Sequence, residues 1–138
     1  PMISPDTFRE VELPPLKRII REAGSLTGKP LSCVMGGDTY PILEAILETG
    51  TGFVICPVET DQAAFLETMK AHPDVMIRVN MDGALITRGD LQAIRDEVDR
   101  LVALVDGRKK VCLGAGAIPY ESAPDVVLKT MAYVKNHT

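Results

Sequence analysis

The stretch that decides the fold is Pro30-Leu-Ser-Cys-Val-Met-Gly-Gly-Asp-Thr-Tyr-Pro-Ile-Leu-Glu-Ala-Ile-Leu-Glu-Thr-Gly-Thr-Gly-Phe-Val-Ile-Cys-Pro-Val-Glu59. Residues 31–35 form a short, mostly apolar run of the kind that a buried parallel strand needs. The pair Gly36-Gly37 allows a sharp turn, and residues 42–47 then place apolar side chains on one helical face. Residues 53–57 form a second buried strand, so the stretch predicts a β-α-β unit.

Capping residues mark the ends of the helix in this unit. Asp38 or Thr39 is placed to cap its first turn, and Pro41 suits that turn because it needs no backbone donor there. Gly50 is predicted to end the helix, since glycine readily adopts the left-handed conformation found after helix ends.

The N-terminal segment is predicted to form two helices. Ser4 caps the first, which Pro14-Pro15 breaks or kinks, because proline inside a helix removes a donor and clashes with the preceding turn. The second helix runs from about Leu16 to Ala23, and Gly24 ends it.

The remainder of the chain repeats the β-α pattern. Further strands are predicted at residues 75–79 and 110–113, and a strong apolar stripe at residues 91–105 predicts the clearest helix. The predicted caps and stops of these later helices are Thr60-Asp61, a Thr87-to-Asp90 capping box, Asp106-Gly107, and Ser122-Ala-Pro-Asp125.

Alternating strands and helices imply a parallel sheet with right-handed crossovers. The order is two helices followed by about four β-α units, in a single α/β segment covering residues 1–138. Four units are half of an eight-fold barrel, which usually needs ~250 residues. The chain is therefore either a small open α/β sheet or part of a larger barrel.

Charge and composition narrow the classes of function. A net charge of -4 and a pI near 5.1 argue against a nucleic-acid surface. The run Arg108-Lys109-Lys110 is interpreted as a solvated turn beside a buried strand. No apolar run approaches the ~20 residues of a membrane span, and no signal peptide is visible. Three cysteines in apolar runs predict buried thiols in the reducing cytoplasm.

Several motifs, in order along nearly the whole chain, resemble the C-terminal half of the (β/α)8 barrel of the uroporphyrinogen decarboxylase family. They are Met2-Ile-Ser-Pro-Asp-Thr-Phe-Arg-Glu, Leu13-Pro-Pro-Leu-Lys-Arg-Ile-Ile, Gly36-Gly-Asp-Thr, Pro41-Ile-Leu, Asn80-Met-Asp, Leu113-Gly-Ala-Gly-Ala-Ile-Pro, and Pro124-Asp-Val-Val. The resemblance implies the fold class: α/β, the C-terminal half of a TIM-type barrel, with about four parallel strands alternating with helices.

That family contains two chemistries, and the chain departs from both. Decarboxylases remove acetate carboxyls from a tetrapyrrole without a cofactor, and they carry a histidine between two glycines where this chain has Ala115 between Gly114 and Gly116. Zinc-dependent relatives transfer methyl groups to corrinoid proteins through His-x-Cys and a later Cys. Residues 34–36 and Gly116 occupy those positions here.

In such a barrel, function lies where the strands end at the C-terminal face. Glu59 and Asp82 follow strands directly, and each is either a substrate-binding or acid/base group or a helix cap. Asn80 either orients a polar substrate or closes its turn. The glycines either cradle an anionic group or make tight turns. The candidate substrate-binding residues are Gly36, Gly37, Glu59, Asn80, Asp82, Gly114 and Gly116, and no catalytic residue is assigned.

Arg78 alternates with apolar neighbours in its strand. It points either to a carboxylate of a ligand, which an arginine fork holds well, or to Glu59 or Asp82 as a structural partner. The structural partner is favoured, because a buried arginine must be paired.

The three thiols lie in different strands, at Cys33, Cys56 and Cys112. They either converge as metal ligands or serve as small buried hydrophobic residues, and the second interpretation is favoured. No Cys-x-x-Cys or His-x-Cys spacing is present, and the histidines, His72 and His137, lie in a turn and in the tail. No cofactor and no metal are therefore expected, with zinc and a corrinoid partner only under the methyltransferase alternative.

The leading interpretation is a uroporphyrinogen decarboxylase-like lyase segment of tetrapyrrole biosynthesis that is inactive alone. The alternatives are a corrinoid-dependent methyltransferase relative with an altered metal site, and a non-catalytic binding or association fragment. The expected partners are a small-molecule substrate, possibly a tetrapyrrole, and further copies of the chain. The apolar inner faces at Val54, Cys56, Val75, Ile77, Val111 and Leu113 are expected to lack partners in half a barrel.

Overall fold

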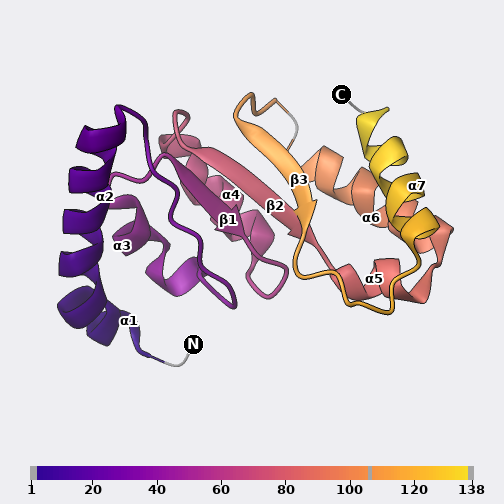
Figure 1. Cartoon of the computed structure of the whole chain (residues 1–138), viewed down its shortest axis with the longest axis horizontal. Coiled ribbons are helices and arrows are strands. Elements are labelled where there is room, and N and C mark those ends of the chain that lie inside the picture. Colours follow the sequence, from indigo (N-terminus) through magenta and orange to yellow (C-terminus); the bar gives the residue numbers. More distant parts are fainter. Residues whose placement is uncertain (1–2, 106, 137–138) are drawn as a thin grey trace.

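Three parallel strands form the centre of the molecule, in the order β1-β2-β3 (Figure 1). They are β1 (Phe53–Cys56), β2 (Met76–Met81) and β3 (Val111–Ala115). The computed structural model describes residues 3–105 and 107–136. The register aligns Ile55 with Arg78 across the first pair of strands, and Arg78 with Cys112 across the second. The predicted α/β class with parallel strands is confirmed.

The strand predicted at residues 31–35 is reduced to one bridge. Ser32 pairs in parallel with Phe53, and the Cys33 N–H donates to the Phe53 carbonyl over 3.1 Å. The same N–H also lies 2.9 Å from the hydroxyl of Thr51. Beyond this point the chain leaves the sheet, and the side chain of Val34 is 65% exposed. Residues 31–33 therefore follow the edge of β1 without extending the ladder.

The two prolines near the N-terminus do not break the helical path. A short α1 (Pro5–Thr7), capped by Ser4 as predicted, continues through the π-helical turn η1 (Phe8–Glu12) into α2 (Leu13–Thr27). Pro14 and Pro15 lie in the first turn of α2, where few backbone donors are needed. The predicted stop at Gly24 is wrong. Helix α2 ends at Gly28, whose φ of 65° is left-handed.

The helix after the first glycine pair is short, and its predicted cap is wrong. It consists of η2 (Tyr40–Ile42) and α3 (Leu43–Leu47). The Tyr40 N–H donates to the hydroxyl of Thr60 over 3.0 Å, and that hydroxyl lies 2.8 Å from Asp38 Oδ1. Thr39 lies at the N-cap position, but its side chain makes no capping hydrogen bond, and the hydroxyl of the distant Thr60 accepts the Tyr40 N–H instead. The helix ends at Leu47 with Glu48 as its C-cap, before the predicted stop at Gly50, which follows in a turn at a φ of 77°.

The next helix follows the prediction closely. Helix α4 (Gln62–Thr68) begins at Asp61, whose carboxylate accepts the Ala64 N–H over 3.0 Å, and it continues as η3 (Met69–Ala71).

A short helix that the sequence pattern does not reveal follows β2. Asp82 caps α5 (Gly83–Arg88), and Gly89 then separates it from α6 (Leu91–Leu104), which Asp90 caps. The predicted capping box is therefore wrong, because Thr87 lies inside α5. Its hydroxyl lies 2.9 Å from that of Ser122.

The last helix, α7 (Pro124–Lys135), begins after Ala123 without a side-chain cap. Ser122 is therefore not its cap, since its hydroxyl meets Thr87 instead. Asp106, part of a predicted stop, lies outside the described residues.

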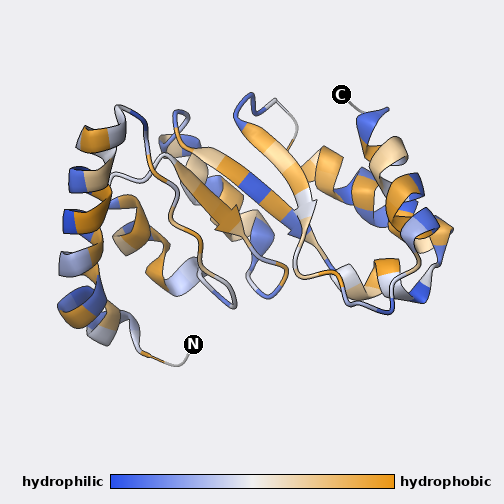
Figure 2. Ribbon diagram, in the orientation of Figure 1, coloured by the Kyte–Doolittle hydropathy of each residue, from blue (hydrophilic) through white to orange (hydrophobic). Residues whose placement is uncertain are grey.

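The two faces of the sheet differ in what covers them. Val54, Cys56, Ile77 and Val79 are at most 2% exposed and belong to the core formed with the helices. Figure 2 shows β1 as continuously hydrophobic, whereas β2 alternates between hydrophobic and hydrophilic residues. The expectation that Val54, Cys56 and Ile77 lack partners is wrong. The less covered face carries Met76, Arg78 and Cys112 instead.

Candidate functional site

The carboxyl ends of the strands surround a cavity of about 530 Å³. It is lined by four segments, 34–37, 57–59, 80–84 and 116–117, together with Ile55 and Arg78. The parallel topology brings these segments together because every strand ends at the same edge of the sheet. Six of the seven candidate residues line this cavity: Gly36, Gly37, Glu59, Asn80, Asp82 and Gly116. Their role in substrate binding stays a prediction.

The glycines around the cavity have different roles. Gly37 has a φ of 76°, which glycine adopts without strain, whereas added methyl groups at Gly36 or Gly116 would meet no atom within 4 Å. Gly83 differs, because a Cβ there would lie 2.9 Å from the carbonyl oxygen of Ala117. The backbone at Gly83 therefore packs closely against the last loop and closes that side of the cavity.

The two carboxylates near the cavity are not equivalent. Asp82 Oδ1 accepts the Ala84 N–H over 2.9 Å, so this residue caps α5. Glu59 is exposed in the turn that follows β1 and lines the cavity. Of the two carboxylates, Asp82 is engaged as a helix cap and Glu59 has an exposed side chain.

A buried amide joins two walls of the cavity. Gln62, only 7% exposed, donates through Nε2 to the carbonyl of Asn80 over 2.8 Å and to that of Pro57 over 3.3 Å. Its Oε1 accepts from Arg100 Nη2 over 2.9 Å, which connects these loops to α6. Sequence reasoning missed Gln62, because its position in the first turn of a helix gives no sign of these long-range partners.

Arg78 lies on the less covered face of the sheet and reaches the cavity. Its Nε donates to Asn80 Oδ1 over 2.9 Å, and its Nη2 donates to the Ala115 carbonyl over 3.2 Å. The expected ion pair with Glu59 or Asp82 is therefore wrong, and both observed acceptors are neutral. Asn80 lines the cavity but is only 6% exposed, and its amide oxygen is held by Arg78.

Gly114, the seventh candidate residue, lies beneath Arg78 instead of lining the cavity. A Cβ at this position would lie 2.8 Å from Arg78 Cδ. Glycine is thus required for Arg78 to lie across β3, and the role of Gly114 in this structure is to admit that side chain.

The thiols belong to separate environments. Cys33 and Cys56 are part of the core, and burial raises the pKa of Cys56 to about 12. Burial also raises the pKa of Cys112, against the nearby positive charge of Arg78. Across residues 3–105 and 107–136, no group of three His, Cys, Asp or Glu side chains is arranged to hold a metal ion. His137 lies outside these ranges.

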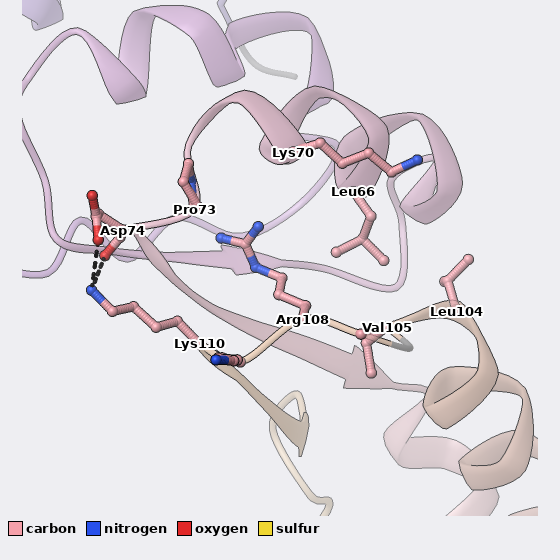
Figure 3. A pocket seen from close by; sticks show the side chains of 10 residues that line it. Leu66, Lys70, Pro73, Asp74, Leu104, Val105, Arg108 and Lys110 are labelled. Carbon is pink, nitrogen blue, oxygen red and sulfur yellow. Dashed lines mark hydrogen bonds and ion pairs between the residues drawn. The ribbon is translucent and has the colours of Figure 1, made fainter.

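A second cavity, of about 590 Å³, lies near the opposite ends of the strands (Figure 3). Arg108 extends into it and donates to the carbonyls of Met69, His72 and Val75 over 2.9, 3.0 and 2.6 Å. The interpretation of residues 108–110 as a solvated turn is therefore wrong for Arg108, which fastens the end of η3 to the start of β2. Burial lowers its pKa. Lys110 reaches Asp74 at 3.2 Å.

Residues 1–137 match the family model described as uroporphyrinogen decarboxylase (URO-D). No curated protein and no solved structure matches the chain significantly. In the part of the chain that the structure describes, every helix is too short or too polar to cross a membrane.

Proposed function

Because the chain belongs to the uroporphyrinogen decarboxylase family, whose fold is a (β/α)8 barrel, we propose that it supplies the C-terminal wall of a tetrapyrrole-binding site. The observation that carries the proposal is the convergence of four strand-end segments on one cavity of about 530 Å³. Strand-end loops are where barrel enzymes bind their substrates. The activity that this family relationship suggests for the complete site is that of a lyase that removes carboxyl groups.

We further propose that the chain alone does not decarboxylate a porphyrinogen. Ala115 occupies the position where the resembling decarboxylases carry histidine. Its methyl group lies beside the hydrophobic core, in an apolar cavity that α6 and α7 also line. Within the described residues, the segment after β3 contributes only Gly116 and Ala117 to the cavity of about 530 Å³, and neither side chain is titratable.

Two assays on the purified chain test the proposal. Uroporphyrin, the stable oxidised form, is titrated into the protein, and the shift of its absorption band is followed. We expect saturable binding, which Tyr40→Ala as a surface control leaves unchanged, since Tyr40 does not line the cavity. Release of carbon dioxide from uroporphyrinogen is then measured. Absence of porphyrin binding contradicts the first proposal, and turnover by the chain contradicts the second.

The methyltransferase alternative requires a zinc site. Cys33 and Cys56 are core residues, and Cys112 lies beside Arg78 on β3, so their places in the fold support the prediction that the chain binds no zinc tightly. Elemental analysis of the purified protein tests it. About one zinc per chain that is lost on Cys33→Ala or Cys112→Ala would restore the alternative.

Self-association and a cytoplasmic location remain part of the proposal. Met76 on the less covered sheet face is 40% exposed, and Leu128 and Met131 on α7 are 65% and 50% exposed. A second copy that covers some of these apolar side chains would remove them from water. Light scattering over a dilution series tests this, and a mass near 15.0 kDa at every concentration contradicts it. The thiols at Cys33, Cys56 and Cys112 are free, as expected of a reducing compartment.

A further inference from the structure

We propose that Arg78 determines specificity in this cavity by binding a carboxylate group of the substrate. The inference rests on the proposed function, because it concerns the same cavity. It adds which residue recognises the substrate and which chemical group of the substrate is recognised.

The hydrogen bonds of Arg78 leave one side of its guanidinium available. An arginine side chain carries five N–H donors. Nε is used by Asn80 Oδ1 and Nη2 by the Ala115 carbonyl, at 2.9 and 3.2 Å. Among the described residues, no acceptor is found for Nη1. The two bonded atoms hold the plane of the group, and Nη1 keeps its two hydrogens for donation to a carboxylate oxygen.

The charge of Arg78 is also not neutralised within the described part of the chain. Both of its acceptors are neutral, and it makes no ion pair there. Asp82 lines the same cavity but caps α5 instead, and Asp38 is bonded to Thr60. A half-buried cation without a counterion is costly, and a bound carboxylate would supply the missing charge.

The surroundings of Arg78 fix its orientation before a ligand arrives. Gly114 admits the side chain across β3, since a Cβ would lie 2.8 Å from Arg78 Cδ. Asn80 is 6% exposed and is itself held through its carbonyl by Gln62. A side chain that is already oriented loses less rotational freedom on binding, so the same contact gives a higher affinity.

The first experiment reports on Arg78 directly. The Nε–Hε signals of the arginines are recorded by ¹H–¹⁵N NMR on the full chain, and the Arg78 signal is assigned by its loss in Arg78→Gln. We expect propionate to shift this signal saturably and propionamide, its neutral counterpart, to leave it unchanged. An unchanged Arg78 signal with propionate overturns the proposal. So does an equal response to propionamide, or a response to inorganic phosphate alone.

The second experiment separates this inference from the proposed function. Uroporphyrin is titrated into Arg78→Gln and into Arg88→Gln, an exposed arginine of α5 that does not line the cavity. Loss of a charged hydrogen-bonding partner predicts at least an about tenfold weaker affinity for Arg78→Gln. The Arg88→Gln affinity is expected to equal that of the wild type. Equal binding by all three proteins overturns the role of Arg78 while the proposed function stands. If the wild type binds no uroporphyrin, the proposed function fails, and the NMR titration alone decides the role of Arg78.

Discussion

The two faces of β2 differ in how far the rest of the chain buries them. Ile77 and Val79 are fully buried against the helices, whereas Arg78, between them, lies half-buried on the other face with only neutral acceptors. Successive side chains of one strand point to opposite faces of the sheet, so the two roles are combined within three consecutive residues. The buried face supplies stability, and the opposite face carries the polar groups of the candidate site.

This contrast teaches where substitutions act. Substitutions on the helix-covered side should lower the free energy of unfolding. They should weaken ligand binding only as far as they reduce the fraction of folded protein. Substitutions on the cavity side should weaken ligand binding and change the free energy of unfolding little, because few apolar contacts are lost there.

The largest effect is expected in the helical layer. Leu101 on α6 is 0% exposed, so Leu101→Ala removes a fully buried side chain and leaves a cavity, at a cost of about 2–5 kcal/mol. The free energy of unfolding is measured by urea denaturation. Leu128→Ala is the matched control, because Leu128 is 65% exposed and should cost no more than about 0.5 kcal/mol. Equal costs for the two variants would show that the buried face is assigned wrongly.

A smaller effect, confined to alkaline pH, is expected from the thiol of Cys56 on the same buried face. Burial raises its pKa from 9.0 to about 12, so above pH 9 the unfolded chain loses this proton before the folded chain does. Stability due to this group is complete below pH 9 and falls by up to about 1.4 kcal/mol per pH unit up to about pH 12.

The measurement compares urea midpoints at pH 8 and pH 10 for the wild type and Cys56→Val. Other groups titrate in both proteins, so the difference between the two slopes isolates the thiol. A wild-type midpoint that falls no more steeply than that of the variant would show that Cys56 is not buried as described.

The smallest change in stability is expected on the cavity face. Gly114→Ala forces the Arg78 side chain to move, and because that side chain is flexible we expect a cost of about 1 kcal/mol, below the usual upper range for overpacking. Gly116→Ala meets no atom within 4 Å and should change stability by less than about 0.5 kcal/mol. Binding of propionate at Arg78 should weaken only in Gly114→Ala. Equal binding by both variants would mean that Gly114 does not position the arginine.

Local sequence signals predicted much of this fold. Apolar runs located all three strands, although the run at residues 31–35 forms only one bridge, and Asp61 marked the start of α4. The α/β alternation also placed the cavity, because parallel strands end at one edge of the sheet. These features depend on residues that are neighbours in sequence or on topology, so they need no knowledge of distant contacts.

Features that depend on contacts between distant residues were not predicted from the sequence. Thr60 takes the capping role expected of Asp38, Ser122 meets Thr87 instead of capping α7, and Arg78 finds an amide and a carbonyl instead of a carboxylate. In each case the hydrogen-bond partner comes from another part of the chain and not from the predicted residue. The periodicity of the sequence cannot show such a partner. The π-helical turn before Pro14 is a local feature, but helical pattern alone gives no sign of it.

The amide of Gln62 has a practical consequence for finding ligands. Its bonds join Pro57 and Asn80 to each other and, through Arg100, to α6, so two walls of the cavity are fastened to the helical layer. Those walls and that layer are therefore expected to melt in one transition. A compound that occupies the cavity then raises the unfolding temperature of the whole chain, because it binds only the folded state. Thermal-shift screening of a carboxylate library is accordingly suited to this protein, even without an enzymatic assay.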